Sequence, residues 1–440
     1  MRTTARLALL LVIASILRDR PAASAPRERP NSGLAPSASL GELSGELARA
    51  AVGLAPGAAI IGLAPAAGSP SLGPAIAVRL AVRVALALGP NAAAWPYAES
   101  ESRARALPHG ARPLVLLTPR LEGDRIAVGA EVVGPATTSD SGATLGRFVA
   151  RRALDAEVRS FLPPVRLQPS ELKPLAGTDA DVLALACADP NHEGATVLAT
   201  LSRARVTLGG VTGSSYQLSR AKRLAELAPV APAPLREPLA SVAFAASGGL
   251  LAGVSDRAHA VRLTPGFETS APLSGLRLPW PGGGCARLEE LFVSSRVERC
   301  APDEQAPAVQ ALRAPADAIA GASVTLRSGA VRLVRAARSA SDGSVTLLDG
   351  EREARLDHAG AQLAVGDLDG DGAPELVTSL DTANPAADAV VVYSWLGTGL
   401  KEAFRTGIPT GVRALAVCPE RVNGIAPIAV AASNGVWVIR

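Results

Sequence analysis

Internal repetition is the feature of this chain that most constrains its fold. Three segments share one pattern, in which a short apolar stretch enters a polar loop and a second apolar stretch leaves it. They are LACADPNHEGATVLATLS from Leu185, LAVGDLDGDGAPELVTSL from Leu363 and LAVCPERVNGIAPIAVAA from Leu415. Many short strands separated by turns are typical of a sandwich, a barrel or a propeller. Recurrence of one strand-loop-strand unit favours the propeller.

Turn residues across the same part of the chain agree with this interpretation. From residue 165 onward, short β-rich runs are broken by Gly, Asp, Ser and Asn, as at Asp349-Gly350 and Asn434-Gly435. At about 45 residues per blade, residues 165–440 are expected to form a propeller of about six blades, with five and seven as the alternatives. The terminal strand VWVIR suits a ring whose last blade is completed by a strand from the propeller's other end.

The second repeat carries an acidic loop whose spacing predicts a metal site. Asp367, Asp369 and Asp371 occupy alternate positions, and Glu375 follows four residues later. The intervening glycines allow sharp turns, and the carbonyl of Ala373 offers a further oxygen. Calcium requires six to eight such hard oxygen ligands. The sequence therefore predicts a Ca²⁺ site at these five residues, and the alternative is a solvated acidic turn.

The segment LAVGDLDGDGAPELV resembles the FG-GAP or VCBS repeat of integrin-type β-propellers, whose loops hold calcium in the pattern D-x-D-x-D-G-x-x-D. Glu375 stands where that pattern has its last Asp. The resemblance covers this loop fully and the rest of residues 165–440 diffusely. It implies a calcium ion with a structural role, in a protein that binds partners.

The other two repeats depart from the calcium pattern. In the first, the loop from Asp189 to Val197 keeps Asp189, Asn191 and Glu193 at the first three ligand positions, but Val197 replaces the final carboxylate. Whether this worn loop binds a metal is left open. In the last repeat Arg421 stands at a ligand position, and its positive charge predicts a metal-free loop.

The N-terminus has the features of an export signal. Arg2 and Arg6 precede an apolar run from Leu7 to Leu17, and Ala23-Ser24-Ala25 forms a small-x-small cleavage pattern. The run is about half of the ~20 residues that a membrane-spanning helix needs, so an uncleaved anchor is the weaker reading. We expect residues 1–25 to be a signal peptide and the mature chain to lie in the periplasm or outside the cell, with no membrane span.

Residues 26–40 are rich in Pro, Ser and Gly and are interpreted as a linker, and residues 41–164 are expected to form a small α/β domain. Its predicted elements are a helix in GELSGELARAAVGL, a strand in AAIIGLAP, a helix from Leu72 to Leu88, a hairpin turning at Glu122-Gly123-Asp124, and a helix from Leu145 to Phe161. This order resembles the TolB N-terminal domain and related envelope domains. The predicted fold class is therefore α+β, with the α/β domain followed by the all-β propeller.

The chain contains four cysteines, which an exported protein tends to pair. Cys285 and Cys300 flank a short segment and are candidates for one disulfide, with buried free thiols as the alternative. Cys187 and Cys418 occupy neighbouring positions of related repeats, and whether they approach each other is left open. The net charge of +4 is scattered and aromatic residues make up 3%, so we expect no nucleic-acid partner.

The motifs of catalysis are missing from the sequence. The four histidines form no H-E-x-x-H motif, and the chain has no G-x-S-x-G elbow or phosphate-binding glycine loop. The sequence favours a non-enzymatic, calcium-binding propeller that binds a protein or polysaccharide. The alternatives are an envelope-assembly factor of TolB-like architecture and, less favoured, a propeller hydrolase or lyase.

Overall fold

The computed structural model describes residues 39–440 except for 66–71, 108–110, 124, 136–141, 169–170, 190–194, 231–237, 246–248, 274–276, 281–283, 290–291, 300–315, 327–329, 351, 397–398 and 422–423. The expected signal peptide lies outside this part of the chain, as does the expected linker up to residue 38. None of the helices in the described residues combines the length and apolar content needed to cross a membrane.

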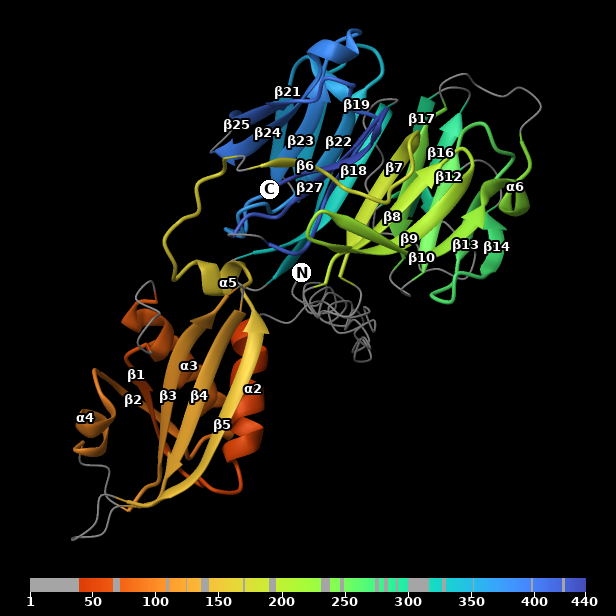
Figure 1. Cartoon of the computed structure of the whole chain (residues 1–440). Coiled ribbons are helices and arrows are strands. Elements are labelled where there is room, and N and C mark those ends of the chain that lie inside the picture. Colours follow the sequence, from red (N-terminus) through yellow and green to blue (C-terminus); the bar gives the residue numbers. More distant parts are fainter. Residues whose placement is uncertain are drawn as a thin grey trace, which may run out of the picture. The chain divides into compact units, whose positions relative to one another are not determined.

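The first part of the described chain forms a five-stranded sheet in the order β2-β1-β3-β4-β5 (Figure 1). Its strands are β1 (Ala59–Leu63), β2 (Ala93–Ala98), β3 (Leu114–Glu122), β4 (Arg125–Val133) and β5 (Thr144–Ala153), and its helices are α2 (Ser39–Ala51), α3 (Pro74–Leu88), α4 (Glu101–Arg105) and α5 (Ala156–Arg159). Strand β1 runs parallel to β2 and β3, and the remaining pairs are antiparallel.

Apolar spacing explains why α2 and α3 pack together on this sheet. In α2, Leu40, Leu43 and Leu47 recur at helical spacing and are fully or almost fully buried, and in α3 Ile76 and Leu80 do the same. They form one core with alternate residues of β3 and β4. The structure thus confirms the helices predicted around residues 41–54 and 72–88, the strand in AAIIGLAP and the β3-β4 hairpin.

The helix predicted from Leu145 to Phe161 was wrong. Residues Thr144–Ala153 form the edge strand β5, which pairs with β4 along its whole length. The leucine, phenylalanine and arginine residues of this segment fit helical spacing as well as strand alternation, and pairing with β4 decides between them. The only helix in this stretch is the short α5, which Asp155 caps by accepting a hydrogen bond from Val158 N.

Residues 172–439 contain five β-sheets, which are the blades of a propeller. The first is β7 (Val182–Ala188), β8 (Val197–Ser202), β9 (Arg205–Thr212) and β10 (Ser215–Arg223), and the second is β11 (Ala240–Phe244), β12 (Leu250–Val254), β13 (Ala260–Leu263) and β14 (Thr269–Leu273). The third is β15 (Arg277–Trp280), β16 (Gly284–Glu289), β17 (Phe292–Arg299), β18 (Ala316–Thr325), β19 (Val331–Ser339), β20 (Val345–Asp349) and β21 (Arg352–Leu356). The fourth is β22 (Ala359–Gly366), β23 (Glu375–Leu380), β24 (Ala389–Leu396) and β25 (Gly399–Gly407), and the fifth is β26 (Ala414–Val417), β27 (Ile428–Ala432), β28 (Gly435–Ile439) and β6 (Leu172–Pro174). The short helix α6 (Leu224–Leu227) and the 3₁₀ turn η1 (Pro385–Ala387) connect strands.

Contacts between neighbouring sheets close a ring. Strand β7 contacts β11 on one side and β26 on the other, β11 contacts β15, and β22 lies between β18 and β26. The fifth sheet is completed by β6, which comes from the start of the propeller and pairs with the C-terminal strand β28. This confirms the closure expected from the terminal VWVIR strand.

The expectation of about six blades was wrong, because five sheets are present. Residues 277–356 form a single seven-stranded sheet, in which Val293 of β17 pairs with Ala316 of β18. A spacing of about 45 residues per blade counts this stretch as nearly two blades. Sequence length therefore overestimates the number of sheets.

The three repeats occupy equivalent places in the ring. Leu185, Leu363 and Leu415 lie in β7, β22 and β26, which are the innermost strands of the first, fourth and fifth sheets. In each case the polar loop joins the innermost strand to the next strand of the same sheet. The predicted strand-loop-strand unit is thus present three times.

Candidate calcium loop and its surroundings

The acidic loop connects β22 to β23 in the fourth sheet. Gly366 and Glu375, which flank it, pair with each other at the ends of the two strands. Leu368 is fully buried in the core shared with the fifth sheet and anchors the loop from within. Gly370 and Gly372 have φ angles of +73° and +82°, a region that residues with a Cβ atom rarely adopt.

Hydrogen bonds within the loop orient its carboxylates. Asp367 Oδ2 accepts from Gly372 N at 3.2 Å, Asp369 Oδ1 from Asp371 N at 3.1 Å, and Asp371 Oδ1 from Ala373 N at 2.7 Å. Glu375 Oε2 accepts from Leu368 N at 2.7 Å. Each bond turns a side chain back over the loop.

Three of the five predicted ligands converge. One carboxylate oxygen from each of Asp367, Asp369 and Glu375 lies within 4.8 Å of the other two. The Asp371 carboxylate belongs to the same loop but is not part of this carboxylate cluster. Asp367 Oδ1 is buried and has no hydrogen-bond partner, which is unusual for a charged oxygen. Hard oxygens with an unused buried lone pair are a donor set that fits a calcium ion.

The electrostatics of the loop disfavour negative charge in the absence of a cation. Burial and the neighbouring Asp371 carboxylate raise the pKa of Asp369 to about 6. Burial, followed by the charge of Asp369, raises the pKa of Glu375 well above its usual range. Burial also raises the pKa of Asp367, against the opposing effect of the Arg421 guanidinium. A divalent cation is the ligand that would relieve this repulsion.

Arg421 reaches this loop from the neighbouring sheet. It lies in the connection between β26 and β27, where Arg421 Nη2 donates to the backbone oxygen of Asp367 at 2.8 Å. The same nitrogen lies 3.6 Å from Asp367 Oδ2. Sequence reasoning placed Arg421 in a metal-free loop of its own and missed its contact with the acidic loop. No local signal predicts this contact, because it joins loops of two adjacent sheets.

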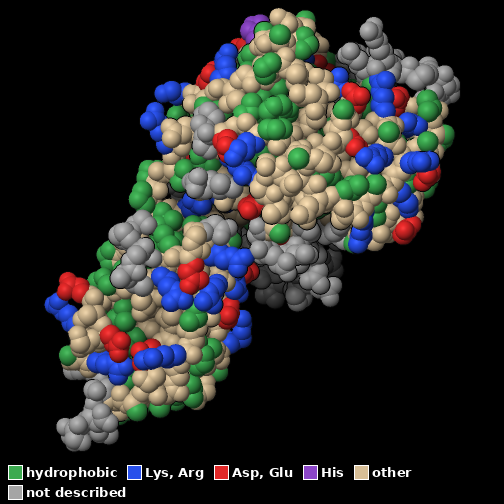
Figure 2. Space-filling model, viewed as in Figure 1, with side chains coloured by type: hydrophobic (Ala, Val, Ile, Leu, Met, Phe, Trp, Pro, Cys, Tyr) green, Lys and Arg blue, Asp and Glu red, His purple; other side chains and the backbone are tan. Residues whose placement is uncertain are grey.

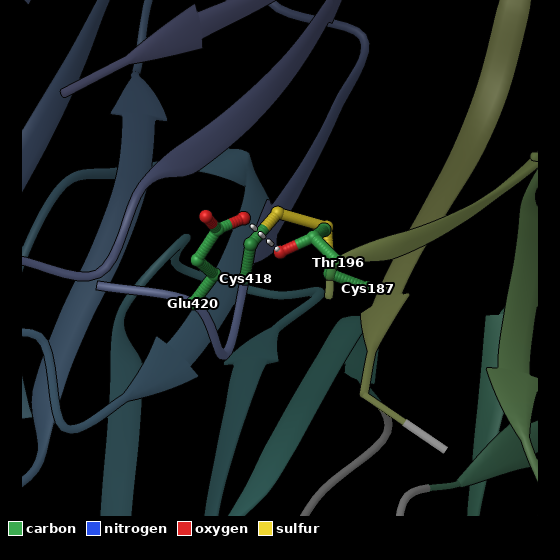
Figure 3. Close-up of a disulfide and its surroundings, with 4 residues drawn as sticks. All are labelled: Cys187, Thr196, Cys418 and Glu420. Atoms are coloured by element: carbon green, nitrogen blue, oxygen red, sulfur yellow. Dashed lines mark hydrogen bonds between the residues drawn. A yellow bond between two sulfur atoms is a disulfide. The ribbon is translucent and has the colours of Figure 1, made fainter. Parts of the chain in front are cut away.

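A disulfide joins the first and fifth sheets at the same end of the ring (Figure 3). Cys187, in β7, is bonded to Cys418, which follows β26, and their Cα atoms are 4.8 Å apart. Beside it Thr196 Oγ1 donates to Glu420 Oε2 at 3.2 Å (Figure 3). The pairing that the sequence left open is therefore present. The proposed partner bond of Cys285 and Cys300 lies outside the described side chains, as do residues 190–194 of the worn loop.

The innermost strands surround a channel of about 1860 Å³. Alanine is the most frequent residue of its wall, and charged side chains gather where β7, β18 and β26 begin. These charges are paired: Arg205 Nε donates to Asp179 Oδ2 at 2.7 Å, and Arg413 Nη1 to Asp181 Oδ1 at 2.6 Å. The polar mouth lies at the opposite ends of these strands from the acidic loop.

Charge pairing also characterises the open face of the N-terminal sheet. Glu122 bonds Arg120 and Arg151, and Glu131 bonds Arg105 and Arg147. In Figure 2 basic and acidic side chains accordingly lie next to one another over these strands. Each of these two glutamates is thus shared by two arginines.

Comparison with known proteins identifies no family. No protein-family model matches the chain, and no curated protein matches it. Similar solved structures include KlHsv2 with loop 6CD replaced by a Gly-Ser linker (7% identity, TM-score 0.32, covering 60% of this chain and 98% of that chain). Others are Hsv2 of Kluyvelomyces marxianus (9%, 0.33, 59% and 72%) and BBS1N in complex with ARL6DN (13%, 0.34, 62% and 84%). The assignment of the fold rests on the strand pairing described above.

Proposed function

We propose that this chain is an exported, non-enzymatic β-propeller that binds calcium at the β22-β23 loop and a protein or polysaccharide through its loop-bearing faces. The observation that carries the calcium assignment is the convergence of Asp367, Asp369 and Glu375 oxygens within 4.8 Å of one another. Asp367 also has a buried oxygen, Oδ1, without a hydrogen-bond partner. In this proposal the FG-GAP or VCBS resemblance of the loop accounts for its spacing.

The calcium ion has a structural role in this proposal. Asp367, Asp369 and Glu375 supply the clustered oxygens, and Asp371 and the Ala373 carbonyl complete the set. Glu375 is the first residue of β23, and Leu368 is anchored in the core, so neutralising the loop stabilises the fourth sheet. Extracellular modules typically bind calcium with Kd values of about 10⁻⁴ to 10⁻³ M.

Calorimetric titration of calcium into the chelator-stripped mature chain tests the site. We expect one bound ion and a higher melting temperature in calcium, and we expect the Asp369→Ala, Asp371→Ala double variant to lose both. Glu402→Gln is the matched control, because Glu402 is an exposed carboxylate on β25 that pairs with Arg405. A double variant that still binds one ion with native affinity contradicts the assignment.

The binding role is proposed from the fold, since propellers commonly present loops to partners. Saturable binding of a purified envelope protein or polysaccharide, reduced by chelator, is the expected result. Turnover of a glycoside or ester substrate panel would instead favour the hydrolase or lyase alternative. Export is tested separately by sequencing the N-terminus of the mature protein, which we expect to begin at Pro26.

A further inference from the structure

The connection between β26 and β27 bridges two features of the ring that the function proposed above does not link. At one side it is fixed to the first sheet by the Cys187-Cys418 disulfide and by the hydrogen bond from Thr196 to Glu420 (Figure 3). At the other it contacts the acidic loop through Arg421 and through Ala426 N, which donates to Leu368 O at 2.7 Å. Only Pro419 and Glu420 lie between Cys418 and Arg421 in the chain.

Arg421 is placed to oppose calcium. Its guanidinium lies 3.6 Å from one carboxylate oxygen of Asp367, while the other oxygen of that group is buried without a partner. The Arg421 side chain is 19% exposed, so solvent screens its charge weakly. A cation bound by Asp367 would therefore meet a second positive charge at short range.

The tether limits how far Arg421 can withdraw. Cys418 N also donates to Pro427 O at 2.8 Å, which closes the base of the connection. On the acidic-loop side, a Cβ atom on Gly366 would lie 2.6 Å from Val417 Cγ1, so the two strands that lead into these loops are in close contact. These contacts hold Cys418 and Ala426 in place on either side of Arg421.

We propose that the Cys187-Cys418 disulfide lowers the calcium affinity of the acidic loop by holding Arg421 against Asp367, so that the redox state of this bond sets the affinity. This inference rests on the calcium site proposed above. A dithiol reductant supplies the two electrons and two protons that convert the disulfide to two thiols, and is itself oxidised to a disulfide. Cys418 then loses its covalent link to the first sheet, and Arg421 moves away from the bound ion. Ala426 and Leu368 keep their backbone contact, so the ligand loop itself stays in place.

Titration of calcium into five forms tests this inference: the oxidised wild type, Arg421→Gln, Arg421→Lys, the Cys187→Ser, Cys418→Ser pair, and that pair combined with Arg421→Gln. A charge within ~4–6 Å changes the affinity of a carboxylate for a proton by about one to three orders of magnitude. We expect Arg421→Gln to tighten calcium binding by about tenfold and Arg421→Lys, which keeps the charge, to tighten it less. The cysteine pair should tighten it by about threefold or more.

The combined variant shows whether the disulfide acts through Arg421. We expect it to bind calcium as tightly as Arg421→Gln alone, because the disulfide has nothing left to position once the charge is gone. If the cysteine variant does not fold, reducing the folded wild type and alkylating its thiols gives the same comparison. Mass spectrometry then verifies that Cys187 and Cys418 are free.

The outcomes separate this inference from the function on which it rests. No calcium binding by the oxidised wild type overturns both. Calcium binding that is unchanged or weakened by loss of the disulfide, with a lower melting temperature alone, overturns the redox control and leaves the calcium site standing. Tighter binding in the cysteine variant that is fully additive with Arg421→Gln overturns the role of Arg421.

Discussion

Glu157 is a residue of α5 whose carboxylate is buried beside α3. Burial and ion pairing act in opposite directions on its pKa. Its side chain is 4% exposed and contacts Arg83, while Arg79 lies 3.8 Å away. Burial is the larger effect and raises the pKa of Glu157 above its usual range, although both arginines lower it. One of its oxygens, Oε2, is buried without a partner.

The sign of the resulting pH dependence follows from linkage. Because the folded protein holds the Glu157 proton more tightly than the unfolded chain, this group favours folding at low pH. Its contribution to the free energy of unfolding declines as the pH rises from the ordinary glutamate pKa to the raised pKa of the folded state. Above that pH the contribution is constant. Glu157→Gln mimics the protonated form at every pH. We therefore expect the stability of Glu157→Gln relative to wild type to be greatest at neutral pH and to shrink on acidification.

Urea denaturation of both proteins between pH 4 and pH 8 measures this difference, with pH values chosen around the ordinary glutamate pKa of about 4.3. Glu402→Gln, at an exposed carboxylate, is the control for general charge effects. A difference between wild type and Glu157→Gln that does not vary with pH would show that the pKa of Glu157 is not raised.

The candidate ligands Asp367, Asp369 and Glu375 could be predicted from the sequence because they lie close together in the chain. Their convergence needs one tight loop and two glycines, all within nine residues of one another. Arg421 was not readable in the same way, because its contact with Asp367 spans two blades. The Cys187-Cys418 bond was not predictable for the same reason, because its ends are 231 positions apart in the sequence.

At the scale of elements, the close approach of β1 to α3 makes a sharp prediction. Gly62 lies in β1, and a Cβ atom there would lie 2.4 Å from Ala77 O and 2.9 Å from Ala77 Cβ. Gly62→Ala must push α3 away from the sheet, at a cost of about 1–3 kcal/mol in the free energy of unfolding. Gly129 of β4 is the matched control, because a Cβ atom there meets Thr118 O at an ordinary 3.8 Å.

Chemical denaturation of Gly62→Ala and Gly129→Ala measures both effects. We expect Gly129→Ala to remain within about 0.5 kcal/mol of wild type, as is typical where a substitution meets no clash. Equal destabilisation of the two variants would mean that α3 does not pack on β1 as closely as the structure shows.

Segments whose apolar residues fit only helical or only strand spacing were predicted correctly. Segments that fit both spacings were not. The leucines of α2 and the isoleucine of α3 fit a helix and no strand, whereas residues 144–153 fit both until β4 supplies a partner. Strand β2 went unrecognised because its sequence, AAWPYA, alternates between half-buried and exposed residues and contains a proline. The hairpin β3-β4 was recognised from two strand-like runs on either side of the turn at Glu122-Gly123-Asp124.

The whole molecule depends on how the ring is closed. The first and fifth sheets are joined by β6 pairing with β28, by the Cys187-Cys418 disulfide and, at the other mouth of the channel, by the Arg413-Asp181 ion pair. Repetition predicted a ring and its closing strand from the sequence. The number of sheets could not be predicted, because whether β17 and β18 pair is decided by contacts between residues that have no local signal.

These contacts differ widely in how much they contribute to the stability of the closed ring. The disulfide closes a loop of 231 residues, for which the chain-entropy model gives roughly 5 kcal/mol. The ion pair joins side chains that are 40% and 76% exposed, and such surface pairs contribute about 0–1 kcal/mol. We expect Cys187→Ser with Cys418→Ser to lower the denaturation midpoint of the propeller strongly, and Asp181→Asn to leave it nearly unchanged. Measured without reductant, equal midpoints for the cysteine variant and wild type would show that β6 and β28 alone hold the ring closed.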